Sequence, residues 1–163
     1  MPLIFKTEGF EALNDQLLTL AKEVRSTDEA KGFIKILTMA TTKTLNPLKD
    51  EVAAKAPYDD DRPPHKADQP HLKNTIRVDS RVPTKKDRES YFVEESDVVI
   101  GILSVKRSAV SLSQEFGNAH TPAHPFLRVV AERNFKTCEN ALRTELSNRI
   151  PAYIKSLSKQ RAK

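Results

Sequence analysis

The sequence predicts an α+β fold, with helices at both ends of the chain and a small antiparallel sheet between them. Apolar residues recur at steps of three and four in the N-terminal third and again after Pro125, which is the spacing of amphipathic helices. Residues 76–81 instead alternate apolar and polar side chains, as a strand with one buried face does. No internal repeat is visible, so we expect one domain over residues 1–163.

Two helices are expected before the sheet. The first covers residues 7–25 and carries an apolar stripe from Phe10 to Val24. The second covers residues 28–55 and contains Pro47. Because proline lacks the backbone N–H group and clashes one turn back, we expect Pro47 to kink or split this second helix.

The middle of the chain is expected to form the loop and the sheet. Residues 57–75 hold four prolines and almost no apolar periodicity, which predicts a loop. Strands are expected at 76–81, at 91–94 and at 98–105, because branched and aromatic residues gather there. The segment at about 82–97 is highly charged at its start and is interpreted as a protruding hairpin arm.

The last helix is expected to begin near Pro125, a residue suited to the first helical turn, and to pack on the sheet. Its apolar stripe extends from Leu127 to Leu157. Pro151 is expected to bend this helix or to end its straight part. Cys138 falls on the stripe and is interpreted as a small core hydrophobe rather than a nucleophile.

Composition excludes several classes of protein. A single cysteine rules out an internal disulfide and fits a reducing cytoplasm. The N-terminus lacks the pattern of a signal peptide, and no window approaches 18 apolar residues, so we expect a soluble chain that is not exported and has no membrane partner.

The net charge of +5 is concentrated in the last third of the chain, where residues 101–163 carry 11 basic and 4 acidic side chains. Clustered charge creates a local potential, so a basic tail at 154–163 is suited to phosphate or to an acidic partner. A solvated helix end is the alternative interpretation.

No catalytic, cofactor-binding or metal-binding residues are predicted. The acidic residues 59–61 lack the glycine turn and distal glutamate of a calcium loop, and are interpreted as solvated carboxylates. His120 and His124 flank a proline-containing turn, which does not give the helical spacing of a zinc site. His65 and His71 have no serine or cysteine nucleophile at a recognisable elbow.

Two segments carry a resemblance to a known family. The first is AAKAPYDDDRPPHKADQPHLKNTIRV, anchored by Ala56, Pro57, Asp59, Leu72 and Ile76. The second is SLSQEFGNAHTPAHPFLRVVAE, anchored by Glu115, Phe116, Gly117, Pro122, Pro125, Phe126, Leu127 and Arg128. In this order and at this separation, the segments resemble the tail-component family of siphophages, described as tail-completion, head-tail joining or neck proteins. The resemblance covers roughly residues 10–150, and the prolines of the loop depart from the family pattern.

The second segment also makes physical sense without the family. Gly117 can adopt a positive φ and so permits a sharp reversal of the chain. Phe126 and Leu127 are placed to anchor the last helix on the sheet. Arg128 is placed to pair with a carboxylate such as Glu115, in the same chain or in a neighbouring one.

The resemblance implies a structural virion protein without enzymatic activity or cofactor, assembled in the host cytoplasm and located in the tail or neck. It would act as a ring subunit, with a hexamer expected from the symmetry of such tails. Its partners would be copies of itself and the adjacent neck, head-closure, and tail-tube or terminator proteins, with a passing contact between the basic tail and DNA left open. The arm is expected to reach a neighbour and extend its sheet. The residues expected at this interface are Lys85, Lys86, Arg88, Tyr91 and Phe92.

Two other functions fit the same sequence. A tail terminator that caps the tail tube would share the small size and the ring form. A small basic nucleic-acid-binding protein would explain the basic last third and a pI near 9.3. Aromatic residues are only 6% of the chain, however, which does not favour a surface that stacks bases.

Overall fold

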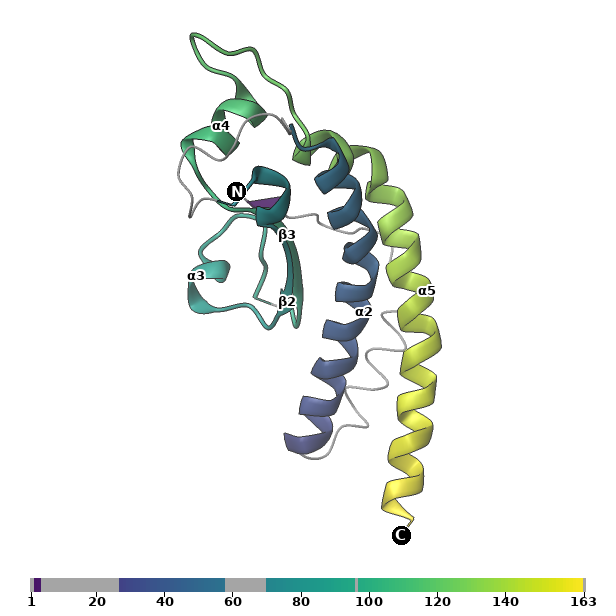
Figure 1. Ribbon diagram of the computed structural model, residues 1–163. Coiled ribbons are helices and arrows are strands. Elements are labelled where there is room, and N and C mark those ends of the chain that lie inside the picture. The colour runs from purple at the N-terminus through teal and green to yellow at the C-terminus, as the bar shows by residue number, and fades with distance from the viewer. Residues whose placement is uncertain (1, 4–26, 58–69, 96, 163) are drawn as a thin grey trace.

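The chain has the predicted α+β fold, seen in a computed structural model that describes residues 2–3, 27–57, 70–95 and 97–162 (Figure 1). In chain order the elements are β1 (Pro2–Leu3), α2 (Thr27–Lys55), the 3₁₀ helix η1 (Leu72–Thr75), β2 (Ile76–Arg81), α3 (Lys85–Arg88), β3 (Ile100–Val105), α4 (Ala109–Phe116) and α5 (Leu127–Arg161). The predicted helix at 7–25 and most of the predicted loop at 57–75 lie outside the described residues.

The sheet has three strands in the order β1-β3-β2, and both pairings are antiparallel. The predicted alternation along β2 is confirmed, because Ile76 is buried and Arg77 and Asp79 are exposed. In the central strand β3 both faces are covered. Residues Leu103 and Val105 face the helices, while Ile102 belongs to a separate buried cluster.

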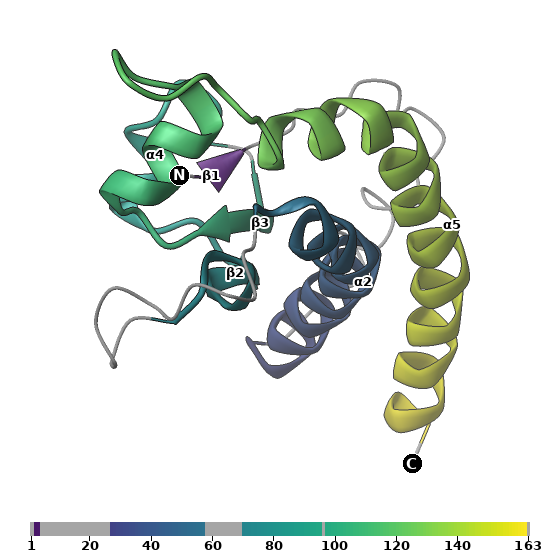
Figure 2. The same cartoon turned by 45° about the horizontal axis from the view of Figure 1, so that its top comes forward.

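The two long helices, α2 and α5, form two layers on one side of the sheet. Helix α2 packs against β2 and β3, and α5 packs along α2 (Figure 1). Figure 2 shows that the first turns of α5 cross the end of α2 before the helix turns to run beside it. These first turns bring Leu127 and Val130 into the core that also contains Leu103 of the sheet. The C-terminal helix therefore meets the sheet-side core at its beginning and α2 along the rest of its length.

Neither helical proline interrupts its helix. Pro47 lies inside α2 and Pro151 inside α5, and both helices continue through them. The predicted split at Pro47 is therefore wrong, and the change of direction of α5 in Figure 2 lies well before Pro151. Both prolines are exposed, as are Lys43 and Ser147 one turn earlier, so the carbonyl groups that lose an N–H partner lie on the solvent side.

The connection between β2 and β3 differs from the predicted arm. It is long, as expected, but it is folded around the short helix α3, and the strand predicted at residues 91–94 is a turn. Its Val93 is buried together with Ile100 and Ile102, so the connection folds back over the outer face of β3. Helix α4 was not predicted, because its eight residues are too few to show a clear helical period.

Candidate assembly surfaces

The N-terminus of α5 is capped by a glutamate from the preceding helix. The carboxylate of Glu115 accepts hydrogen bonds from the backbone N–H groups of Phe126 at 3.0 Å, Leu127 at 3.1 Å and Arg128 at 2.9 Å. Glu115 is buried at 4% exposure. The first N–H groups of a helix have no partner within it, and they attract negative charge. Glu115 therefore fixes where α5 begins.

The turn between α4 and α5 requires glycine at its start. Gly117 has a φ of 74°, and a Cβ atom there would lie 2.9 Å from the backbone nitrogen of Ala123. The turn is closed by an antiparallel bridge between Asn118 and Thr121. The predicted reversal at Gly117 is thus confirmed.

The outward side of the same turn carries an aromatic ring and a guanidinium group. Phe116 is 48% exposed, and the guanidinium carbon of Arg128 lies 5.8 Å from the centre of its ring. The pairing expected between the Glu115 and Arg128 side chains is therefore replaced by two other contacts. Glu115 binds backbone N–H groups, and Arg128 stacks on Phe116 in an exposed cation–π contact.

The two segments that carry the family resemblance meet in one core. Ala56, Ile76, Phe126 and Leu127 belong to the same buried cluster, and Leu72 packs against it. Phe126 is the largest side chain of the cluster and is 1% exposed. Pro57 follows Ala56 in the sequence and Pro125 precedes Phe126, and both prolines are half-buried. Most of the predicted motif residues therefore hold the fold together.

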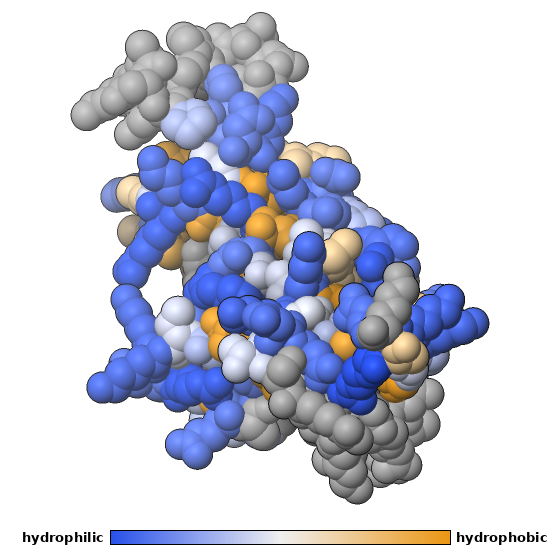
Figure 3. Space-filling model, turned by 90° about the horizontal axis from the view of Figure 1, so that it is seen from below, coloured by the Kyte–Doolittle hydropathy of each residue, from blue (hydrophilic) through white to orange (hydrophobic). Residues whose placement is uncertain are grey.

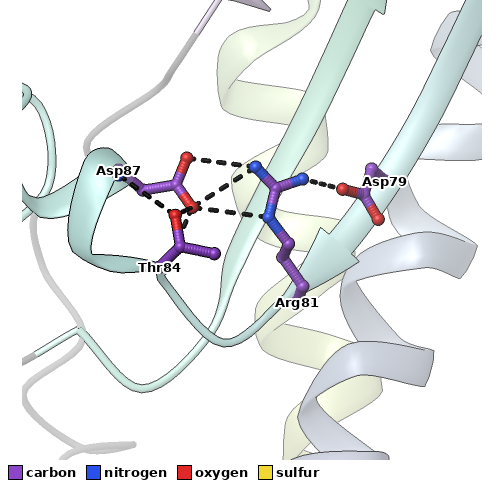
Figure 4. A network of polar contacts seen from close by, with 4 residues as sticks. All are labelled: Asp79, Arg81, Thr84 and Asp87. Carbon is purple, nitrogen blue, oxygen red and sulfur yellow. Dashed lines mark hydrogen bonds and ion pairs between the residues drawn. The ribbon is translucent and has the colours of Figure 1, made fainter.

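A polar network fixes the start of the connection between β2 and β3 (Figure 4). The guanidinium group of Arg81 donates to both carboxylate oxygens of Asp87, at 3.0 and 3.3 Å, and also contacts Asp79. Thr84 and Asp87 form a capping box around α3. The Thr84 hydrogen bonds, together with Arg81, lower the pKa of Asp87 from its ordinary value of 3.8 to about 2. This carboxylate therefore stays charged well into the acid range.

The rest of the connection is held by Arg88. Its guanidinium group donates to the carbonyl oxygens of Glu94 at 2.9 Å, Glu95 at 2.8 Å and Asp97 at 3.2 Å. Arg88 was expected at an interface with a neighbour; within its own chain the guanidinium group makes these three contacts, and the interface stays a prediction. Its charge satisfies three backbone carbonyl groups of this turn.

The other predicted interface residues are exposed. Tyr91 is 96% exposed and Phe92 is 54% exposed, and their rings meet edge to face with centres 5.7 Å apart. Lys85 and Lys86 of α3 are exposed as well. The connection therefore presents an aromatic pair and two lysines from a backbone that the network and Arg88 hold in place.

A groove lies between α2, α5 and the end of this connection, with a volume of about 270 Å³. Its apolar lining includes Leu45, Val99, Phe135, Cys138 and Leu142. Its charged lining residues, among those described, are the carboxylates Glu94, Asp97 and Glu139. The sequence does not reveal this groove, because residues from three distant segments form it and no local pattern marks them.

Cys138 behaves as the sequence predicts. It is half-buried on the apolar stripe of α5, and its thiol lies 3.8 Å from the carbonyl oxygen of Thr44. Burial raises the pKa of the Cys138 thiol from 9.0 to about 11. Thiolates are the reactive form, so this side chain is a poor nucleophile at neutral pH.

The end of α5 is basic but partly anchored. Arg161 donates to the Glu29 carboxylate at 2.9 Å, and Leu157 is buried against α2. Lys155 and Lys159 are exposed. Figure 3, which views the molecule from the end where α5 finishes, shows a mainly hydrophilic face with smaller hydrophobic areas between.

The described residues contain no group of three or more metal-ligating side chains. The acidic residues 59–61 and His65 lie outside the described ranges, whereas His71, His120 and His124 lie within them. None of the described helices has the length and apolar character needed to cross a membrane. Comparison with family models, with curated proteins and with solved structures finds no match to the chain.

Proposed function

We propose that the protein is a non-enzymatic subunit of a ring at the head-proximal end of a long phage tail, where tail and head are joined. The proposal rests on the resemblance of the two segments around Ala56–Ile76 and Glu115–Arg128 to tail-completion and neck proteins. It is supported by the meeting of Ile76, Phe126 and Leu127 in one buried cluster. Segments that pack together in this way depend on one another for the fold.

The structural observation that supports assembly with neighbouring subunits is the exposed aromatic pair on a fixed connection. Tyr91 at 96% exposure contributes little to the fold of its own chain. Aromatic residues are enriched at the centres of protein interfaces because they bury a large area at a low entropic cost. The Arg81–Asp87 contacts and the three carbonyl contacts of Arg88 hold the backbone beforehand, so little order has to be gained on binding.

The direct test is to locate the protein in particles. Antibodies against the purified chain would be applied to particles released from the cells that carry its gene, and gold labels would be imaged by electron microscopy. Label at the junction of head and tail is the expected result. Label only at the free end of headless tails would favour a tail terminator, and an absence of label on particles would contradict the proposal.

A second test addresses assembly. We expect the isolated protein to be monomeric or weakly associated and to form a stable ring mainly in the particle, where adjacent proteins add further contacts. Light scattering at micromolar concentration would measure this. A salt-resistant ring of free subunits would contradict the expectation.

A further inference from the structure

The acidic groove is unusual for this chain. The protein carries a net charge of +5, yet the charged residues among the described lining of the groove are Glu94, Asp97 and Glu139. The Glu139 carboxylate has Arg143 at 3.4 Å, and the Asp97 carboxylate accepts from the backbone N–H of Glu94 at 2.8 Å. A groove with an apolar lining and three carboxylates suits a partner that combines an apolar side chain with a cation.

The volume of the groove limits which groups can bind in it. Small-molecule sites usually have volumes of about 300–1,000 Å³. The volume of about 270 Å³ lies just below that range and is open to receive one or two protruding side chains. One or two side chains of another protein can therefore occupy the groove.

Elsewhere on its surface, the same chain carries an apolar ring and a cation side by side, as the groove requires. Phe116 and Arg128 form a stacked aromatic–guanidinium pair on the outer side of the turn before α5, and Val129 beside them is 37% exposed. Lys106 and Arg107, just before α4, are exposed too. Arginine and aromatic residues are the side chains that most often anchor protein interfaces. We call Phe116 and Arg128 the anchor pair.

We propose that the anchor pair of one copy docks in the acidic groove of a second copy, with Phe116 on the apolar lining and Arg128 facing Glu139 and Asp97. This inference rests on the proposed ring function and names the surfaces that make the ring. Anchor pair and groove are different surfaces, so the contact is head-to-tail. The second copy keeps its own anchor pair to continue the series until the ring closes.

The cross-linking test uses the substitution Arg128→Lys, which keeps the cation and supplies an amine. A carbodiimide joins an amine to a carboxylate only when the two are in contact, and it accumulates products even from a weakly populated complex. An equimolar mixture of ¹⁴N- and ¹⁵N-labelled protein would be treated and digested. The expected product is a hybrid-mass peptide linking position 128 to Glu139, Asp97 or Glu94. Its absence would overturn the proposal.

Charge exchange supplies the control. In the Arg128→Lys background, Glu139→Gln removes the carboxylate that the carbodiimide activates, so the loss of one cross-linked peptide assigns that peptide to position 139. The double variant Arg128→Glu with Glu139→Lys should restore the cross-link with the two groups exchanged, and Arg128→Glu alone should not. A matched variant, Lys155→Gln on the basic end of α5, should leave the cross-link unchanged. If instead Lys155 or Lys159 is the residue linked to Glu139, the basic end of α5 occupies the groove and the anchor pair does not.

The size of the cross-linked product separates the ring from a closed pair. Products larger than a dimer are expected, and a series that stops at the dimer would overturn the head-to-tail arrangement. The two proposals also fail separately. Gold label at the neck without the cross-link would leave the ring function standing and reject the anchor pair. The cross-link without label on particles would keep the contact and reject the phage location.

Discussion

The turn before α5 and the connection between β2 and β3 both carry exposed aromatic rings, but different forces hold the two segments in place. The turn is built on burial, with Phe126 at 1% exposure beneath it and a buried glutamate closing the helix end. The connection is built on exposed or half-exposed charges, chiefly the Arg81–Asp87 pair. Burial stabilises by several kcal/mol per large side chain, whereas an exposed ion pair contributes about 0–1 kcal/mol. The buried side of the turn should therefore matter for folding, whereas the connection and the outer side of the turn should matter for binding.

The largest loss of stability is expected when the buried ring of Phe126 is removed. Phe126→Ala should lower the free energy of unfolding by about 3–5 kcal/mol, because it leaves a cavity in the core cluster. The matched control is Phe116→Ala; this ring is 48% exposed, so its removal should cost less than about 1 kcal/mol. Urea unfolding followed by circular dichroism measures both. Equal losses for the two variants would contradict the division between an inward and an outward phenylalanine.

The next effect concerns the buried carboxylate. Glu115→Gln should lower the free energy of unfolding by about 1.5–3 kcal/mol, because the amide group cannot accept from all three N–H groups of Phe126, Leu127 and Arg128. The same substitution at the exposed Glu132, in the first turns of α5, is the control and should change stability by less than about 0.5 kcal/mol. If Glu115→Gln were as mild as Glu132→Gln, the cap would not stabilise the helix end.

The sequence was most informative where one local pattern decides the structure. The helix predicted at 28–55 is observed at Thr27–Lys55, and the strand predicted at 76–81 is β2. Both carry a clear apolar period, and both bury the face that the period predicts. The positive φ of Gly117 was also predictable, because a glycine beside Asn118 marks a reversal.

The sequence was less informative where the outcome depends on which groups meet in space. Tyr91–Glu94 has the composition of a strand, but Arg88 binds the carbonyl groups that follow and holds a turn instead. The role of Glu115 as a cap depends on a helix end eleven residues away. The groove needs residues from α2, α5 and the connection at once, and no spacing along the chain reveals it.

A smaller effect is expected in the connection. Asp87→Asn should loosen residues 84–95 while lowering the free energy of unfolding by about 1 kcal/mol, because the Arg81–Asp87 pair is only partly buried, with side-chain exposures of 39% and 18%. Hydrogen exchange read by mass spectrometry near neutral pH would show faster exchange in this segment. The control is Asp50→Asn on the exposed side of α2, which should leave the segment unchanged. Unchanged exchange in Asp87→Asn would mean that Arg88 alone holds the connection.

The lowered pKa of Asp87 gives this prediction a pH dependence. Because the folded-state pKa of about 2 lies below the ordinary value of 3.8, the contribution of Asp87 is present above about pH 4 and is lost as the pH falls through about 2. Amide signals of residues 84–88 in a nuclear magnetic resonance titration should shift in that window. Asp87→Asn should remove this titration, and a midpoint near pH 4 in the wild type would contradict the role of Thr84 and Arg81.

Replacing the exposed ring of Tyr91 should have the smallest effect on folding and directly tests whether the connection binds a partner. Tyr91→Ser removes a ring that is 96% exposed, so the free energy of unfolding should change by less than about 0.5 kcal/mol. If the connection is a binding surface, the same substitution should lower the number of completed particles in a complementation assay, because the partner loses an aromatic contact. The control is Met39→Ser on α2, where the side chain is 47% exposed, and it should leave particle yield unchanged. A Tyr91→Ser protein that is both stable and fully competent in assembly would show that this ring takes no part in binding. The connection and the turn before α5 would then differ only in the forces that hold them.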